Sequence, residues 1–158
     1  MPNPDVGSLS VALRAAAHRE RWLRSGDVAV SLTELARGSC LGGRREELRG
    51  RSVLVRTKSP LTAALALIET DGVARRLVLS PPDLAEEHIP YVVATAGVDV
   101  IVSEDDGAAH ASTVPTRIPC SSAIAEAAAV DAAPIATEWI LFTSGTTGLP
   151  KMVVHTLA

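Results

Sequence analysis

The stretch Trp139-Ile140-Leu141-Phe142-Thr143-Ser144-Gly145-Thr146-Thr147-Gly148-Leu149-Pro150-Lys151 joins an apolar run to a loop of hydroxyls, glycines and one lysine. A short apolar run bounded by turn residues predicts a buried strand. Glycines let a backbone turn freely and approach a ligand closely. Backbone N–H groups, hydroxyls and an ammonium group all donate to phosphate oxygens. The stretch therefore predicts a strand followed by a loop that binds an oligophosphate.

Two other phosphate-binding motifs do not fit this loop. A Walker loop has glycine immediately before its lysine and a hydroxyl residue after it. Here Leu149-Pro150 separates Gly148 from Lys151, and Met152 follows. The dinucleotide pattern Gly-x-Gly-x-x-Gly is also absent from the segment. The alternative interpretation is a polar turn between two strands, with Lys151 as an exposed loop lysine.

Thr143 to Lys151 resembles the phosphate-binding loop of the adenylate-forming superfamily, which includes acyl-CoA synthetases, peptide-synthetase adenylation domains and luciferases. The family pattern is roughly Thr/Ser-Ser-Gly-Thr/Ser-Thr-Gly-x-Pro-Lys-Gly, and only Met152 departs from it. The resemblance implies that Lys151 pairs with the polyphosphate charge. Thr146 and Thr147 are the best candidates for direct contacts, and no catalytic residue is assigned. The implied phosphate cradle consists of Thr143, Ser144, Gly145, Thr146, Thr147 and Gly148.

The same resemblance implies an activity. Family members activate a carboxylic acid with ATP and Mg²⁺ as an acyl-adenylate, and most pass the acyl group to a thiol such as coenzyme A. Donors and a cation near the phosphates stabilise the charge that develops as pyrophosphate leaves. The implied partners are thus a nucleotide and a carboxylic acid.

The family's later motifs, for adenine, ribose and a C-terminal catalytic lysine, do not occur in the 158 residues. We therefore expect an N-terminal fragment of an acyl-CoA ligase that is inactive alone. Two alternatives stay open: a non-catalytic nucleotide- or phosphate-binding module, and one half of a split ligase completed by a second polypeptide.

The amino-acid composition limits the classes of protein to which the chain can belong. Hydrophobic residues make up 47% of the chain and aromatic residues 3%, so a core of Ala, Val, Leu and Ile is expected. The net charge of −3 gives no sign of a nucleic-acid surface. The first residues do not have the basic region followed by an apolar region that is typical of a signal peptide, and the apolar runs are too short to span a membrane. A cytoplasmic protein is expected.

No metal site is expected. Cys40 and Cys120 lack a Cys-x-x-Cys spacing and indicate reduced thiols. Asp105-Asp106 precedes a glycine and is typical of a solvated turn. A lone histidine on a strand, His155, is more often structural than catalytic. The remaining histidines share no ligand spacing: His18, His88 and His110.

Periodicity and capping residues predict the elements. Residues 103–134 are expected to be mostly irregular, with one helix predicted at Ser122–Val130. The expected helices are Ser10–Arg24, a turn at Leu32–Ala36, Pro60–Thr70 capped by Ser59, and Pro90–Ala96. The expected strands are Val28–Val30, Ser52–Arg56, Arg76–Ser80, Val98–Val102, Glu138–Phe142 and one from Met152.

Alternating strands and helices predict an α/β fold. We expect an incomplete parallel-type sheet with flanking helices, similar to the N-terminal part of an adenylate-forming fold. Residues 1–50 would form an N-terminal helix and an irregular entry segment. Residues 51–158 would form a partial α/β subdomain with the phosphate-binding loop at 143–151.

Overall fold

The computed structural model describes residues 7–16, 20–104, 114, 116–129, 132–143 and 148–156. No helix in these ranges is long and apolar enough to cross a membrane. The elements in chain order are α1 (Leu9–Ala16), β1 (Trp22–Ser25), β2 (Val28–Ser31), α2 (Leu32–Arg37), β3 (Gly38–Ser39), the 3₁₀ helix η1 (Arg45–Leu48), β4 (Ser52–Arg56), α3 (Pro60–Thr70), β5 (Arg76–Leu79), the 3₁₀ helix η2 (Glu86–His88), α4 (Ile89–Ala96), β6 (Val100–Ser103), β7 (Thr116–Pro119), β8 (Ala125–Glu126), β9 (Glu138–Thr143) and β10 (Lys151–Thr156).

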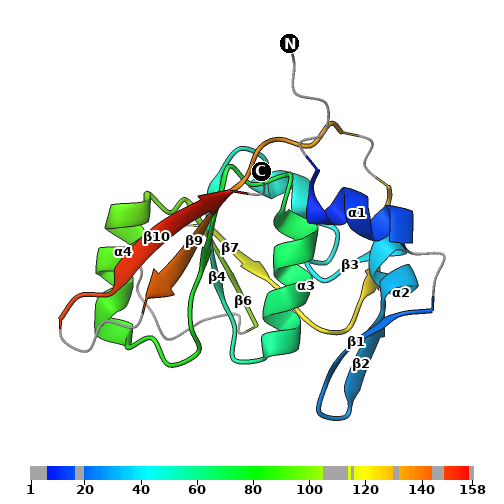
Figure 1. Cartoon of the computed structure of the whole chain (residues 1–158), viewed down its shortest axis with the longest axis horizontal. Helices are drawn as coiled ribbons and strands as arrows, with labels where there is room; N and C mark the ends of the chain where they lie inside the picture. The colour runs from blue at the N-terminus through cyan, green and yellow to red at the C-terminus, as the bar shows by residue number, and fades with distance from the viewer. Residues whose placement is uncertain are drawn as a thin grey trace.

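A six-stranded sheet in the order β10-β9-β5-β4-β6-β7 forms the centre of the molecule (Figure 1). Strands β9, β5, β4, β6 and β7 run parallel to one another. Only β10 runs antiparallel, beside β9. The expected α/β fold with a parallel-type sheet and flanking helices is therefore confirmed.

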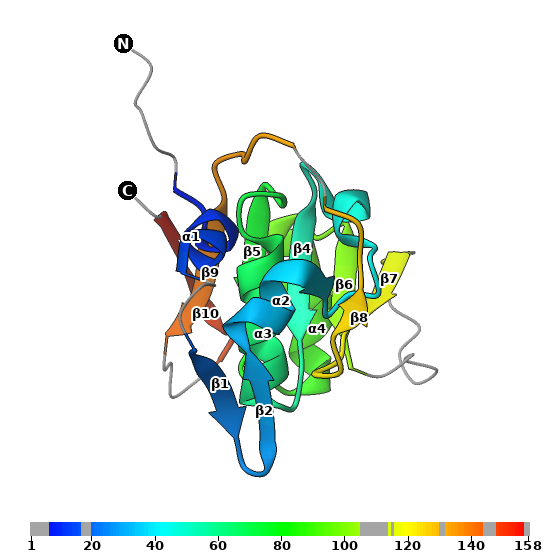
Figure 2. The same cartoon turned by 90° about the vertical axis from the view of Figure 1, so that its right-hand side faces the viewer.

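Helices cover both faces of the sheet (Figures 1 and 2). Successive side chains of a strand point to opposite faces. Val53 and Val55 of β4 accordingly join the core cluster under α3. Leu54, between them, joins the cluster under α4. Burial on both faces explains why β4 is apolar at consecutive positions rather than at alternate ones.

The two long crossover helices begin and end as their sequences predict. Ser59 caps α3, because its Oγ accepts a hydrogen bond from the Thr62 amide at 3.3 Å, and Pro60 occupies the first helical position. The α4 helix carries Pro90 at its start. It ends at Gly97, whose φ of 61° is left-handed and therefore favours glycine.

The predicted helix Ser10–Arg24 is wrong in its second half. Helix α1 ends at Ala16, and Trp22–Ser25 is strand β1 of a hairpin with β2. Ser25 pairs with Val28, so only Gly26 and Asp27 form the turn, and Gly26 has a φ of 55°. Gly26 thus connects two strands instead of ending a helix, and tertiary pairing overrides the helical spacing of the leucines.

The predicted helix Ser122–Val130 is also wrong, and strand β7 was not predicted. Ala125–Glu126 is strand β8 and pairs with Gly38–Ser39. The Ser121 amide donates to the Cys40 carbonyl at 2.9 Å. A side chain at Gly38 would collide with Ile124, so this pairing needs glycine there. Residues 125–126 pair with a distant strand instead of forming a helix. No pattern in the neighbouring sequence indicates this pairing.

Candidate functional site

The carboxyl ends of the parallel strands form one edge of the sheet, and the candidate site lies there. Helix α3 follows β4 and packs on one face, whereas α4 follows β5 and packs on the other. Neighbouring strands whose connections leave to opposite faces open a crevice at their carboxyl ends, where α/β proteins bind ligands. Strand β9, adjacent to β5, carries its own C-terminal loop to this edge.

The predicted phosphate loop closes the hairpin between β9 and β10. Thr143, the last residue of β9, pairs with Lys151, the first residue of β10. The register therefore brings the first and last residues of the family-like segment opposite each other. Ser144, Gly145, Thr146 and Thr147 lie outside the described residues. The cradle that these four were predicted to form stays a prediction.

The structure describes Gly148 and Lys151, and their roles in phosphate binding stay predictions. Gly148 has a φ of 103°, a conformation that side-chain-bearing residues rarely adopt. No atom of the described residues lies within 4 Å of the position of an added Cβ, so the backbone conformation is the observed reason for glycine here. Lys151 is exposed at the base of the loop. Its ammonium group is thus free of burial and available to an anionic ligand.

His155 is exposed on β10 and pairs with Trp139, near the start of β9. Four residues of strand separate it from Lys151, which is roughly 13 Å at 3.3 Å per residue. His155 therefore lies away from the loop. Asp105, Asp106, His18 and His110 lie outside the described residues. Within the described part of the chain, no group of histidine, cysteine and acidic residues could hold a metal ion.

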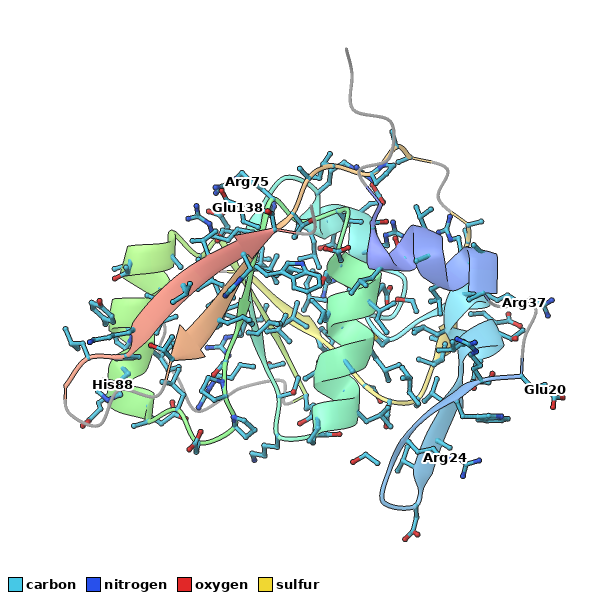
Figure 3. The ribbon with its side chains drawn as sticks, viewed as in Figure 1. Glu20, Arg24, Arg37, Arg75, His88 and Glu138 are labelled. Carbon is cyan, nitrogen blue, oxygen red and sulfur yellow. The ribbon has the colours of Figure 1, made fainter. Side chains whose placement is uncertain are left out.

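The start of β9 is held at the opposite edge of the sheet. Arg76 of β5 donates through Nε and Nη2 to Glu138 Oε2, at 2.9 and 2.7 Å. Trp139 Nε1 donates to Asp71 Oδ1 at 2.8 Å. Figure 3 shows Glu138 and Arg75 at this amino edge, and His88 toward the carboxyl edge. These contacts fix the register of the strand that delivers the loop.

The carboxyl edge also carries charged residues that the sequence reasoning missed. Arg56, at the end of β4, forms an ion pair and hydrogen bond with Glu86 of η2, which follows β5. This pair joins the end of β4 to the segment that follows β5. Glu104, which follows β6, accepts from the Lys58 amide at 2.7 Å and holds the turn that begins α3. Arg56 and Glu104 lie at or just after the end of a strand, whereas Glu86 lies in η2, and no local pattern pairs it with Arg56.

This combination defines the class of the molecule: a doubly wound α/β fold with a hydroxyl- and glycine-rich hairpin loop at its carboxyl edge. No family model matches the chain, and no curated protein matches it. Solved structures do match its fold. It has the fold of the N-terminal part of adenylate-forming enzymes.

Three of the matching structures illustrate the likeness. The N-terminal subdomain of Klebsiella oxytoca NpsA matches 92% of this chain with a TM-score of 0.68 and 16% identity. The inhibitor-bound N-terminal domain of Mycobacterium tuberculosis FACL13 matches 94% with a TM-score of 0.66 and 22% identity. Bacillus subtilis o-succinylbenzoate CoA synthetase (MenE), in complex with the acyl-adenylate intermediate OSB-AMP, matches 94% with a TM-score of 0.69 and 18% identity.

The chain spans about two fifths of the length of these structures: 40% of NpsA, 44% of FACL13 and 42% of MenE. The likeness therefore concerns the first part of the adenylate-forming fold, as the sequence predicted.

Proposed function

We propose that this chain is the N-terminal portion of an ATP-dependent acid–CoA ligase, and that its β9–β10 loop binds the polyphosphate of ATP. The observation that carries the proposal is the place of the loop. A segment that matches the adenylate-forming phosphate pattern lies at the carboxyl edge of a sheet with the adenylate-forming fold. The sequence pattern and the place of the loop in the fold both support this ligand.

The roles of the residues follow from the chemistry. A carboxylate attacks the α-phosphate of ATP, and pyrophosphate leaves with increased negative charge. Donors from Thr143 to Gly148 and the ammonium group of Lys151 stabilise that charge. Positive φ at Gly148 lets the backbone turn around the phosphates. Mg²⁺ would supply further charge neutralisation when bound with ATP, and coenzyme A is the proposed acyl acceptor. Matching structures that contain AMP and an acyl-adenylate support the adenylate part of the proposal.

The test is a titration of the isotopically labelled chain with ATP and with a hydrolysis-resistant acyl-adenylate analogue, followed by amide NMR. We expect shifts at Thr143, Gly148 and Lys151, and little change at Asp71 on the amino edge. Shifts confined to the amino edge, or none with either ligand, would overturn the proposal. Carboxylate-dependent exchange of labelled pyrophosphate into ATP is expected to be absent in the 158-residue chain, because reaction needs groups on both sides of the phosphate.

A further inference from the structure

A second pocket lies at the amino edge of the sheet, away from the β9–β10 loop. It has a volume of about 250 Å³ and opens between α1, α2 and the last turn of α3. Helix α3 starts after the carboxyl end of β4, so its last turn, with Glu69, returns to the amino edge. One side of the pocket is apolar, with Leu13, Leu35 and Ile68. Three arginines also line it: Arg14, Arg37 and Arg45.

Arg45 has a donor that the protein leaves unused. Its Nε is the buried side-chain nitrogen without a hydrogen-bond partner among the described residues. The side chain of Arg45 is only 17% exposed, and Glu46 Oε1, with which Nε forms an ion pair, is 3.9 Å away, which is too far for a hydrogen bond. A buried donor without an acceptor is unfavourable, so a further acceptor beside this guanidinium group would be stabilising.

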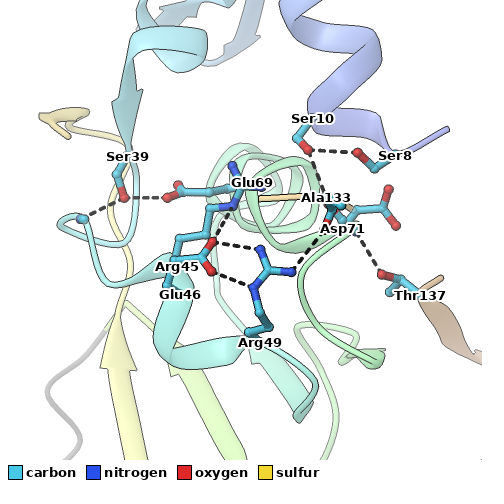
Figure 4. Close-up of polar contacts among 12 residues, drawn as sticks. Ser8, Ser10, Ser39, Arg45, Glu46, Arg49, Glu69, Asp71, Ala133 and Thr137 are labelled. Carbon is cyan, nitrogen blue, oxygen red and sulfur yellow. Dashed lines mark hydrogen bonds and ion pairs between the residues drawn. The ribbon is translucent and has the colours of Figure 1, made fainter. Parts of the chain in front are cut away.

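Both neighbouring carboxylates are held by other donors (Figure 4). Arg49 donates to Glu46 at 2.6 and 3.1 Å and holds the pKa of that carboxyl below its ordinary value. Glu69 accepts from Ser39 Oγ at 2.5 Å and from the Cys40 amide at 2.7 Å. Neither carboxylate is therefore placed to satisfy Arg45 Nε.

Charges of both signs surround Arg45. Burial lowers the pKa of Arg45, and the like charges of Arg14 and Arg49 lower it further. Glu46 and Glu69 raise this pKa, and Glu69 also lines the pocket. Arg14 is exposed near the end of α1, so its guanidinium group can point toward the pocket or toward solvent. Bringing the guanidinium group of Arg14 toward that of Arg45 is therefore favoured when a further anion lies between the two groups.

We propose that this pocket binds a small organic oxyanion, a carboxylate or phosphate group with a compact apolar body. The guanidinium group of Arg45 donates to the oxyanion, Arg14 adds charge at the rim, and Leu13, Leu35 and Ile68 contact the apolar body. The volume lies just below the range typical of drug-sized ligands, which limits the occupant to a small molecule. The site is separate from the proposed ATP site and does not depend on it.

The test is an amide NMR titration of the chain with benzoate and with inorganic phosphate, replacing chloride so that ionic strength stays constant. The amides of Ser39 and Gly43, which line the pocket, are the reporters. Arg45→Lys keeps a charge but lacks the planar guanidinium donor, and we expect roughly tenfold weaker binding. For the exposed Arg14→Gln we expect a smaller loss, roughly threefold.

Thermal unfolding of Arg14→Gln provides a second measurement. Because Arg14 is exposed and repels Arg45, its removal should leave the melting temperature unchanged or slightly higher while binding weakens. The matched control is Arg75→Gln, an exposed arginine outside the pocket, which should bind as the wild type does. Saturation by benzoate alone or by phosphate alone supports the site and identifies the oxyanion class. Absence of saturation with both probes, or equal affinity in all the variants, would overturn it.

Discussion

Among the loop residues that the structure describes, Gly148 has the backbone conformation that tolerates a side chain least. Its φ of 103° lies in a region that valine reaches only with strain of about 1–3 kcal/mol. We expect Gly148→Val to change the loop and to weaken ATP binding. Gly7→Val is the matched control, because Gly7 has open space around it and no positive φ. Calorimetry and thermal melting measure both effects. ATP binding by Gly148→Val at wild-type affinity would make the loop a simple strand connection.

Cys40 and Cys120 are buried free thiols that remain protonated in the folded chain. Burial and the neighbouring Glu69 raise the pKa of Cys40, and burial raises the pKa of Cys120 to about 12. In the unfolded chain both thiols ionise near pH 8.5. The unfolded state therefore binds fewer protons at higher pH, so the thiols make the folded state less stable as pH rises above that value.

The expected size is about 1.4 kcal/mol per pH unit for each thiol between the unfolded and folded pKa values. The measurement is the free energy of unfolding by urea at pH 8 and pH 10. The double variant Cys40→Ala/Cys120→Ala should show a shallower decline over that interval. An identical decline in both proteins would show that the thiols ionise equally in the folded state.

At the scale of elements, Asp71 links the N-terminal helix to the loop-bearing strand. Its Oδ2 accepts from the Leu9 amide at 2.7 Å, and its Oδ1 accepts from Trp139 Nε1 at 2.8 Å. Asp71→Ala removes both acceptors, so we expect a loss of about 2–3 kcal/mol of stability by urea unfolding. Asp83→Ala, at an exposed carboxylate, is the control and should change stability little. A similar small change in both variants would show that Asp71 does not hold α1 and β9.

The elements that could be predicted are those whose signals are local. Ser59-Pro60 begins α3 and Gly97 ends α4, because capping and positive φ are properties of one or two residues. Strands β1 and β8 could not be predicted, because each depends on a partner strand. The same limit applies to the site. The motif at 143–151 could be found in the sequence, whereas the Arg56–Glu86 pair depends on the meeting of β4 and η2.

At the scale of the whole molecule, strand β10 is exposed on both sides. It lies at the end of the six-stranded sheet, and its side chains Val153 and Val154 are 41% and 53% exposed. An exposed apolar edge strand can pair with another chain. We therefore expect concentration-dependent self-association of the 158-residue chain.

Sedimentation over a range of concentrations measures this association. Val154→Lys places a charge on the edge strand and should weaken it. Val11→Lys is the matched control, because Val11 is 48% exposed but lies on helix α1. A strict monomer at all concentrations, or equal association in the two variants, would show that β10 is not the contact.

The central claim is that the β9–β10 loop binds the polyphosphate of ATP, and calorimetric titration of the chain with ATP at constant salt tests it most directly. The wild type should bind saturably. Lys151→Ala should weaken binding by about 1–3 kcal/mol, the scale of one charge-assisted contact. Arg75→Ala removes the same charge from the exposed amino edge and should bind as the wild type does. Equal ATP affinity in the wild type and Lys151→Ala would contradict the account.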